Sequence, residues 1–235
     1  MFLRRKRPLL CLVTDRARLG GRAAKADALA ALVAQVGAAA RGGVDLVQIR
    51  ERDLPARDLL DLVGRCLDAA QGTGARVVVN DRLDVALACG AHGVHLRGDS
   101  PEAARVRTIA PAGFVVGRSV HGEAEAVAAA ARGGLDYLIL GTVFESASKP
   151  PRHPLLRLED CGRVARAVDL PVLAIGGITL DRVPAVLRAG AAGVAAIGLF
   201  AGAGDDPGAA TRRARAAADA VVAGGRSGKL TADST

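Results

Sequence analysis

The sequence predicts an α/β fold, a single (β/α)8 TIM barrel, from three observations. The chain of 235 residues has the length of one such domain. Eight short apolar runs alternate with longer segments of helical pattern. Strict alternation implies parallel strands joined by helical crossovers, and eight such units close into a barrel. A doubly wound open sheet is the alternative, but TDRARLGGRA, which follows the first run, lacks the GxGxxG phosphate loop of that fold.

The apolar runs are the expected strands, because each is rich in Val, Ile or Leu and too short for a helix. They cover residues 9–13, 45–49, 76–79, 93–96, 114–117, 137–140, 171–175 and 193–197. Clear helical segments lie at 25–40, 56–71, 122–132, 180–189 and 207–223. We expect residues 1–8 to be a basic lead-in, residues 9–223 to form the barrel domain, and residues 224–235 to be a disordered tail.

Composition limits the partners. Half of the residues are hydrophobic and 2% are aromatic, so the core has to be built from Ala, Val, Leu and Ile. The net charge of +8 favours small anionic ligands. Nucleic acid is not an expected partner, because the chain has few aromatic side chains to stack on bases. No run of about 18 apolar residues occurs, so we expect no membrane span. The sequence leaves both a monomer and a homo-oligomer open.

The cysteines and the N-terminus predict a cytoplasmic protein. The four cysteines have neither metal-ligand nor disulfide spacing, and we interpret them as small buried hydrophobic residues in a reducing compartment. The start MFLRRKRPLLCLVTD resembles a signal peptide in its basic part. Its apolar run is short and ends in Thr14 and Asp15, so a first strand is the better interpretation.

Polar residues follow the apolar runs closely, at the strand ends where such a barrel holds its active site. The candidates are Gln48, Arg50, Arg52, Asn80, Asp81, His95, Asp99, Arg118, Ser119, His121, Ser146, Ser148 and Lys149. Arg50, Arg52 and Lys149 are three cations expected on one rim. Arg grips phosphate with two parallel hydrogen bonds, and Lys acts as a movable point charge. This pattern predicts a site for an anion such as a diphosphate.

A glycine pair predicts a second anion site. Gly176 and Gly177 end the run at 171–175, and Gly198 follows the run at 193–197. Without Cβ atoms, backbone N–H groups approach an anion closely. Phosphate sites in these barrels often use the last two strand–helix loops together with a helix N-terminus. The alternative is a pair of glycines that serves a tight turn. The segment from Glu145 to Pro154, rich in Pro, Ser and charge, is a candidate lid.

Asp81, next to Asn80, admits two interpretations. It could hold Mg²⁺, which takes few protein carboxylates and keeps substrate oxygens and water. It could equally be the N-cap of a helix expected to begin near Arg82. His121 lies beyond a strand end, where an acid–base group is useful. His95 lies within a run, and we expect it to face inward with its hydrogen bonds satisfied.

Five segments taken together resemble the thiamine phosphate synthase / TenI (thiazole tautomerase) family of thiamine biosynthesis. They are VQIRERD (47–53), VVNDRLDVALACGAHGVHL (78–96), GRSVH (117–121), LGTVFESASKP (140–150) and PVLAIGGIT (171–179). The likeness covers about residues 9–223. It implies a transferase that joins hydroxymethylpyrimidine diphosphate to a thiazole phosphate and releases pyrophosphate, with Mg²⁺ as the cofactor.

The resemblance also implies roles for individual residues. The diphosphate and pyrimidine would contact Gln48, Arg50, Asn80, Ser119 and Lys149. Asp81 would hold Mg²⁺. Gly177 and the Ile197–Gly198 region would bind the thiazole phosphate through backbone N–H groups. Ser146 and Ser148 stand where the synthase commonly has threonines.

One departure keeps an alternative activity open. The synthase usually has HLGQxD where this chain has HLRGDS (95–100), so Ser100 replaces a second Mg²⁺ ligand. Asp99 reaches the metal only if the loop shifts by one residue. The thiazole tautomerase resembles the chain in this serine, and there His121 would shuttle a proton without metal. A third reading is a catalytically silent member that binds thiamine precursors or a protein partner.

Overall fold

The computed structural model describes residues 7–19, 25–146, 154–201 and 206–230, which form a closed barrel of eight parallel strands. The strands are β1 Leu9–Val13, β2 Leu46–Ile49, β3 Arg76–Asn80, β4 Gly93–Leu96, β5 Val115–Val120, β6 Tyr137–Gly141, β7 Val172–Ile175 and β8 Gly193–Ala196. Each strand pairs with its neighbours in sequence, and β1 closes the ring on β8. The predicted (β/α)8 fold is confirmed.

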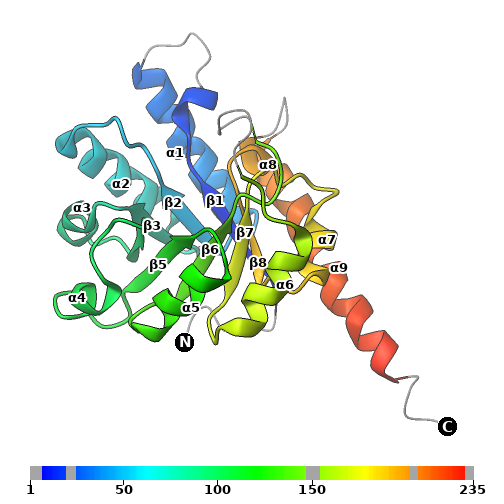
Figure 1. Ribbon diagram of the computed structural model, residues 1–235. Coiled ribbons are helices and arrows are strands. Elements are labelled where there is room, and N and C mark those ends of the chain that lie inside the picture. The colour runs from blue at the N-terminus through cyan, green and yellow to red at the C-terminus, as the bar shows by residue number, and fades with distance from the viewer. Residues whose placement is uncertain (1–6, 20–24, 147–153, 202–205, 231–235) are drawn as a thin grey trace.

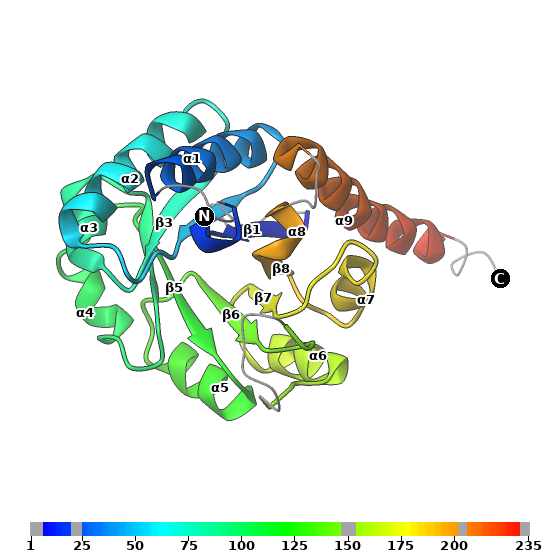
Figure 2. The same ribbon diagram turned by 90° about the horizontal axis from the view of Figure 1, so that it is seen from above.

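Helices ring the barrel on the outside (Figures 1 and 2). They are α1 Lys25–Arg41, α2 Ala56–Ala70, α3 Leu83–Ala88, α4 Ala103–Arg107, α5 Glu123–Ala131, α6 Leu158–Ala167, α7 Val183–Arg188, α8 Gly198–Ala201 and α9 Pro207–Leu230, with a 3-10 turn η1 at Arg16–Arg18. The one-turn helix α8 lies at the end of the barrel where the strands finish. In the described ranges no helix is long and apolar enough to cross a membrane.

Two boundaries differ from the sequence prediction. β5 runs on through Val120, which pairs with Leu140 of β6, so Arg118 and Ser119 lie within the strand and not after it. The last helix continues through Leu230, past residue 223, where the sequence predicts the barrel domain to end. Once a helix is nucleated, each further residue adds one hydrogen bond at little cost, and the pair Gly224–Gly225 does not stop it. Residues 231–235 lie outside the described part.

The barrel has two apolar cores because side chains alternate along each strand. One set points into the barrel and packs as Leu9, Cys11, Val13, Leu46, Val78, Val115, Tyr137, Ile139, Leu173 and Ala195. The other set, with Leu10, Leu12, Val47 and Val77 among its members, packs against the helices. The inner set fills the lower barrel and leaves the inward positions at the strand ends for polar residues.

The inner core is built around Tyr137, the single tyrosine of the chain. Tyr137 is fully buried, and its neighbour in the ladder is Gly117 of β5. A Cβ atom at position 117 would overlap the Tyr137 ring. The space left by this glycine is therefore what admits an aromatic ring to a barrel interior of aliphatic side chains.

The last helix is tied to the start of the barrel through a buried carboxylate. Asp45, 1% exposed, accepts hydrogen bonds from the Leu10 backbone N–H and from the guanidinium groups of Arg7 and Arg215. Arg215 of α9 also donates to the carbonyls of Pro8 (2.6 Å) and Gly43 (2.9 Å). These contacts hold α9 against the residues that precede β1 and β2.

We predict that Gly117→Ala destabilises the protein by about 1–3 kcal/mol, because the added methyl group has to displace the Tyr137 ring. Gly64→Ala in α2 is the matched control, since a Cβ there meets nothing within 4 Å, and it should stabilise by about 0.5–1 kcal/mol. The free energy of unfolding from urea titrations checks both. Equal effects of the two substitutions would contradict the packing described.

Candidate active site

A cavity of about 400 Å³ opens at the strand ends of the barrel, and we call it the mouth cavity. Its wall is formed by inward-facing residues of successive strands, in register. Asn80 pairs with His95, His95 with Gly117, and Ser119 with Ile139. Sequence candidates in its lining are Gln48, Arg50, Arg52, Asn80, His95, Asp99, Ser119, His121, Ser146, Gly176 and Ile197.

Gln48 presents an unused donor to this cavity. Its side chain comes from β2, where the residue pairs with Val13, and it is 3% exposed. Within the described residues its Nε2 is a buried side-chain nitrogen without a hydrogen-bond partner. Leaving a buried donor unpaired costs about 1–3 kcal/mol. A ligand acceptor in the mouth cavity would remove that cost.

His95 is buried and hydrogen-bonded at both ring nitrogens, as the sequence predicts for an inward-facing histidine. Its Nδ1 lies 3.0 Å from the Tyr137 hydroxyl and its Nε2 lies 2.9 Å from Ser119 Oγ. Burial, followed by the nearby positive charge of Arg118, lowers the pKa of His95 to about 3. The ring is therefore neutral at physiological pH. Burial also raises the pKa of Tyr137, which keeps its phenol protonated.

Arg50 and Arg52 bring two cations to the cavity without a matching acid. In the described part of the chain neither side chain forms a hydrogen bond or ion pair. Burial first, and then the charge of Arg52, lower the pKa of Arg50. A like charge beside a half-buried guanidinium is unfavourable until an anion arrives. The third predicted cation, Lys149, lies outside the described residues, as does Ser148.

Hydrogen bonds among Thr14, Arg16 and Glu51 fix the position of the Arg50 backbone. Thr14, fully buried at the end of β1, donates to Glu51 Oε1 (2.7 Å) and accepts from the Arg50 backbone N–H (2.9 Å). Glu51 also accepts from Arg16 (2.8 Å), and Arg16 in turn pairs with Asp53. Thr14 and Arg16 thus hold Glu51 in place, and Thr14 positions the Arg50 backbone while the Arg50 guanidinium lines the mouth cavity.

The acidic candidates meet at one guanidinium. Arg97 contacts Asp81 (3.4 Å) and Asp99 (2.8 Å), and Ser100 Oγ donates to Asp81. Asp81 has a positive φ of 62°, and the helix N-cap position falls on Arg82. The N-cap interpretation of Asp81 is therefore wrong. Asp81 itself lines a small neighbouring cavity of about 130 Å³, which shares Arg52, Asn80 and Arg97 with the mouth cavity.

Arg118 holds the loop that carries Arg97 and Asp99. The side chain is 5% exposed and donates to the carbonyls of Arg97 (2.9 Å), Gly98 (3.1 Å), Ser100 (3.2 Å) and Pro101 (2.6 Å). A planar guanidinium with five N–H groups can bind several carbonyls at once. Sequence reasoning placed Arg118 at the strand end and gave it no role. The role was missed because all four carbonyl partners belong to the loop after β4, which the sequence pattern does not place beside Arg118.

The glycine pair lines a second cavity, of about 490 Å³, which we call the glycine cavity. Gly176 and Gly177 have positive φ values of 109° and 58°. A Cβ at either position would overlap residues 142–145, so the turn requires glycine. Ile197, Gly198, Arg18 and Arg182 complete much of this wall.

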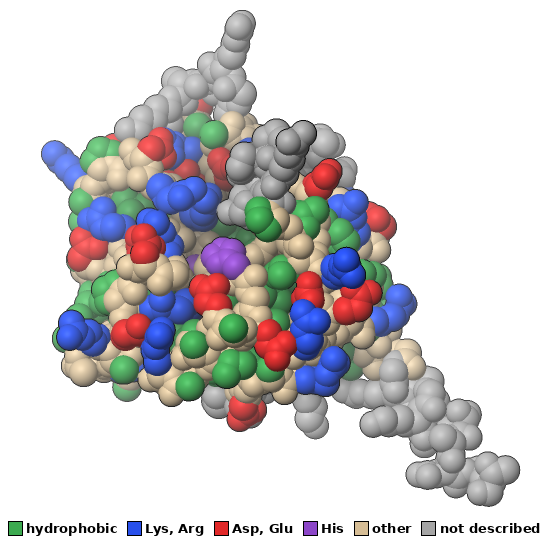
Figure 3. Space-filling view, viewed as in Figure 1, with side chains coloured by type: hydrophobic (Ala, Val, Ile, Leu, Met, Phe, Trp, Pro, Cys, Tyr) green, Lys and Arg blue, Asp and Glu red, His purple; other side chains and the backbone are tan. Residues whose placement is uncertain are grey.

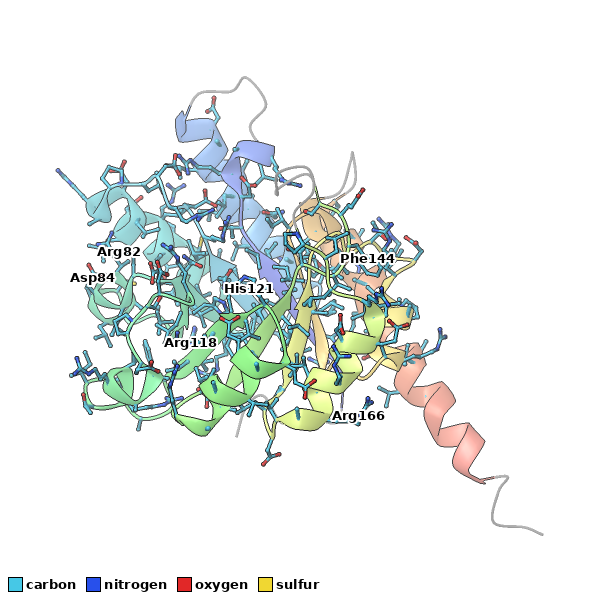
Figure 4. The ribbon with its side chains drawn as sticks, in the orientation of Figure 1. Arg82, Asp84, Arg118, His121, Phe144 and Arg166 are labelled. Atoms are coloured by element: carbon cyan, nitrogen blue, oxygen red, sulfur yellow. The ribbon has the colours of Figure 1, made fainter. Side chains whose placement is uncertain are left out.

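The two cavities are neighbours, since four residues line both of them. These are Ser146, Ile175, Gly176 and Ile197. At the mouth, His121 is exposed, and its Nδ1 lies 3.2 Å from Glu125 Oε2. In Figure 4 His121 lies near the middle of the view, and Figure 3 shows a histidine there beside a group of basic side chains. Two ligands bound in these cavities would meet at the shared wall.

Fold and site together define a barrel enzyme with two adjoining cavities at its strand ends. The family model for thiamine monophosphate synthase matches residues 10–200, and the chain belongs to this family. The thiamine-phosphate synthase of Roseiflexus castenholzii is 42% identical over 88% of this chain and 86% of the relative. That of Methanoculleus marisnigri is 42% identical over 81% and 88%. The fold of thiamine phosphate pyrophosphorylase from Pyrococcus furiosus superposes with a TM-score of 0.78 at 32% identity, covering 93% of this chain and 98% of that one.

We predict that Arg118→Met frees the loop of residues 97–101, because four carbonyls lose their common donor. Hydrogen exchange at the backbone amides of this loop should accelerate at least roughly tenfold, since a lost hydrogen bond to a charged group costs about 1.5–3 kcal/mol. Arg105→Met, an exposed position in α4, is the control and should leave exchange unchanged. Unchanged exchange in the Arg118 variant would show that the loop is held otherwise.

Proposed function

We propose that the chain is a thiamine-phosphate synthase, which joins hydroxymethylpyrimidine diphosphate to a thiazole phosphate and releases pyrophosphate. The observation that carries the proposal is the pair of cavities with a shared wall. One is lined by two guanidinium groups that have no ion-pair partner among the described residues, and the other is lined by a glycine turn. Membership of the thiamine monophosphate synthase family supports the same reaction.

The mouth cavity takes the pyrimidine diphosphate in this proposal. Gln48 and Ser119 supply polar contacts inside the barrel, where a ring has room among aliphatic side chains. Arg50 and Arg52 lie higher on the rim and bind the diphosphate together with Asn80 and Lys149. Two cations without acidic partners favour an anion with several negative charges.

The glycine cavity takes the thiazole phosphate. Backbone N–H groups at Gly176–Gly177 and at Ile197–Gly198 can approach a phosphate closely, because Gly176, Gly177 and Gly198 carry no Cβ. Arg18 and Arg182 add positive charge to the same wall. Ser146 lines both cavities, and we assign it to the boundary between the two substrates.

Asp81 and Asp99 fit Mg²⁺ as a cofactor whose coordination would be completed by substrate oxygens. Asp81 and Asp99 already share one cation, the Arg97 guanidinium, so two carboxylates can serve a single positive centre there. The described residues contain no cluster of three acidic, His or Cys side chains for a metal. Mg²⁺ commonly uses one or two carboxylates with phosphate oxygens and water. When bound, it would neutralise charge on the departing pyrophosphate.

The protein's own groups then direct the reaction. The pyrimidine C–O bond breaks, its electron pair leaves with pyrophosphate, and the thiazole nitrogen forms the new C–N bond to the carbon. Arg50, Arg52 and Lys149 stabilise the charge that develops on the leaving oxygens. The shared wall sets the two reacting atoms side by side, which supplies proximity.

Catalysis and its metal dependence test the proposal directly. Purified protein should release pyrophosphate only when both substrates and Mg²⁺ are present. Asp81→Asn should weaken the apparent Mg²⁺ affinity by more than roughly tenfold. Asp84→Asn is the control, because this exposed acid at the start of α3 pairs with Arg82 and lines none of the three cavities described above (Figure 4). Metal-independent aromatisation of the thiazole that is lost in His121→Ala would instead establish the tautomerase.

The division of the pocket makes a second prediction. Arg50→Ala and Lys149→Ala should each weaken pyrophosphate binding by about 1.5–3 kcal/mol, the value of one charge-assisted contact, and spare the thiazole phosphate. Gly177→Ala should do the reverse, because its methyl group forces the turn apart. Calorimetric titration of each ligand measures the split. Equal losses for both ligands in every variant would refute the assignment of the cavities.

A further inference from the structure

A buried hydrogen-bond chain runs from the barrel core to the mouth cavity and is not used by the chemistry above. It links the Tyr137 hydroxyl to His95 Nδ1 (3.0 Å) and His95 Nε2 to Ser119 Oγ (2.9 Å). Tyr137 is 0% exposed, His95 is 1% exposed, and Ser119 lines the cavity. The inner end of this hydrogen-bond chain, Tyr137, is shielded from solvent, and its outer end, Ser119, faces the mouth cavity.

The direction of the hydrogen bonds follows from the inner end. The phenol has one proton, and within the described residues its hydroxyl has His95 Nδ1 as its hydrogen-bond partner. If His95 donated to Tyr137, the phenol proton would be buried without an acceptor, which is strongly unfavourable. The phenol must therefore donate to Nδ1, and the neutral His95 ring carries its own proton on Nε2.

The outer end is then fixed as well. With its proton on Nε2, His95 donates to Ser119 Oγ, so this hydrogen bond uses an acceptor lone pair of the serine. The Ser119 hydroxyl proton is left over, and the described residues provide no other hydrogen bond for it. A protonated imidazole would also donate to Ser119, so the direction of the His95–Ser119 hydrogen bond is the same whether the ring is neutral or charged.

We propose that Tyr137 and His95 are positioning residues that fix Ser119 as a hydrogen-bond donor toward the ligand in the mouth cavity. The subsite beside Ser119 then selects a ligand atom that accepts a hydrogen bond, such as an unprotonated aromatic ring nitrogen or an anionic oxygen. A ligand that offers only a donor, such as N–H, could use the second lone pair of Ser119 Oγ but would leave the Ser119 hydroxyl proton without an acceptor, so it should bind less well there. This deepens the proposed function and rests on it for the identity of the ligand.

Gly117 makes the Tyr137–His95 hydrogen bond possible. A side chain at this position would overlap the Tyr137 ring, and Gly117 lies between His95 and Tyr137 in the strand ladder. The missing Cβ lets the phenol sit beside the imidazole, with ring centroids 5.5 Å apart. Core packing and ligand selection are thus joined at one glycine.

The tautomer of His95 tests the inference without any enzymatic activity. In protein labelled with 15N-histidine, the His95 ring should show a protonated Nε2 and an unprotonated Nδ1. His95→Gln identifies the resonances among the four histidines of the chain. A protonated Nδ1 in the wild-type ligand-free protein would overturn the proposal, because Ser119 would then have to donate to the histidine.

A double-mutant cycle tests the effect on ligand binding. Tyr137→Phe keeps the ring and removes the donor, so it should weaken binding of hydroxymethylpyrimidine diphosphate roughly tenfold. The same substitution should change binding in a Ser119→Ala background by less than roughly twofold, and it should spare thiazole phosphate in both. If the losses of binding free energy from the two substitutions add, or if both ligands lose equally, Tyr137 acts through general packing. Either result would overturn the proposal that Tyr137 positions Ser119.

The two measurements separate this inference from the function on which it rests. If the wild-type protein does not bind hydroxymethylpyrimidine diphosphate, the proposed function fails, while the tautomer measurement still decides the direction of the hydrogen-bond chain. Thermal unfolding of each variant in the cycle shows whether the fold is intact. Ser119→Thr, which retains a hydroxyl, should restore binding relative to Ser119→Ala, and failure of this rescue would count against a donor role.

Discussion

The alternation of side chains along eight in-register strands is the constraint on which this structure depends. In a closed barrel every second residue points inward, and the strand ladder sets which inward residues share a layer. Gln48, Asn80, His95 and Ser119 come from four strands and line one cavity for this reason. A shift of one residue in β2 would turn Gln48 toward the helices and replace it with an apolar neighbour.

The charged groups of the mouth are sorted by how they are held. Glu51 has cationic and hydroxyl partners, and Arg118 has four carbonyl partners, so both support the loops. Arg50 and Arg52 have no such partners among the described residues and line the mouth cavity. Arg97 combines both arrangements, because it pairs with Asp81 and Asp99 and also lines the mouth cavity. Binding of metal and of anion should therefore affect each other at this loop.

Much of the fold and of the mouth was predictable from the sequence, because both follow from local patterns. The eight apolar runs gave eight strands, and polar residues near the ends of these runs gave Gln48, Asn80, Ser119 and the glycine turn. What sequence missed depends on partners distant in the chain. The role of Arg118 comes from carbonyls of another loop, and the orientation of Ser119 comes from Tyr137. The extent of α9 was missed because paired glycines do not always end a helix.

The unpaired amide of Gln48 offers the most direct test of whether the inward layer is the ligand site. Its side-chain NH₂ resonances should shift on addition of hydroxymethylpyrimidine diphosphate, because a ligand acceptor would replace the missing hydrogen-bond partner. Thiazole phosphate alone should leave them nearly unchanged, since Gln48 does not line the glycine cavity. Unchanged Gln48 resonances at saturating pyrimidine diphosphate would contradict the assignment of the site to the barrel mouth.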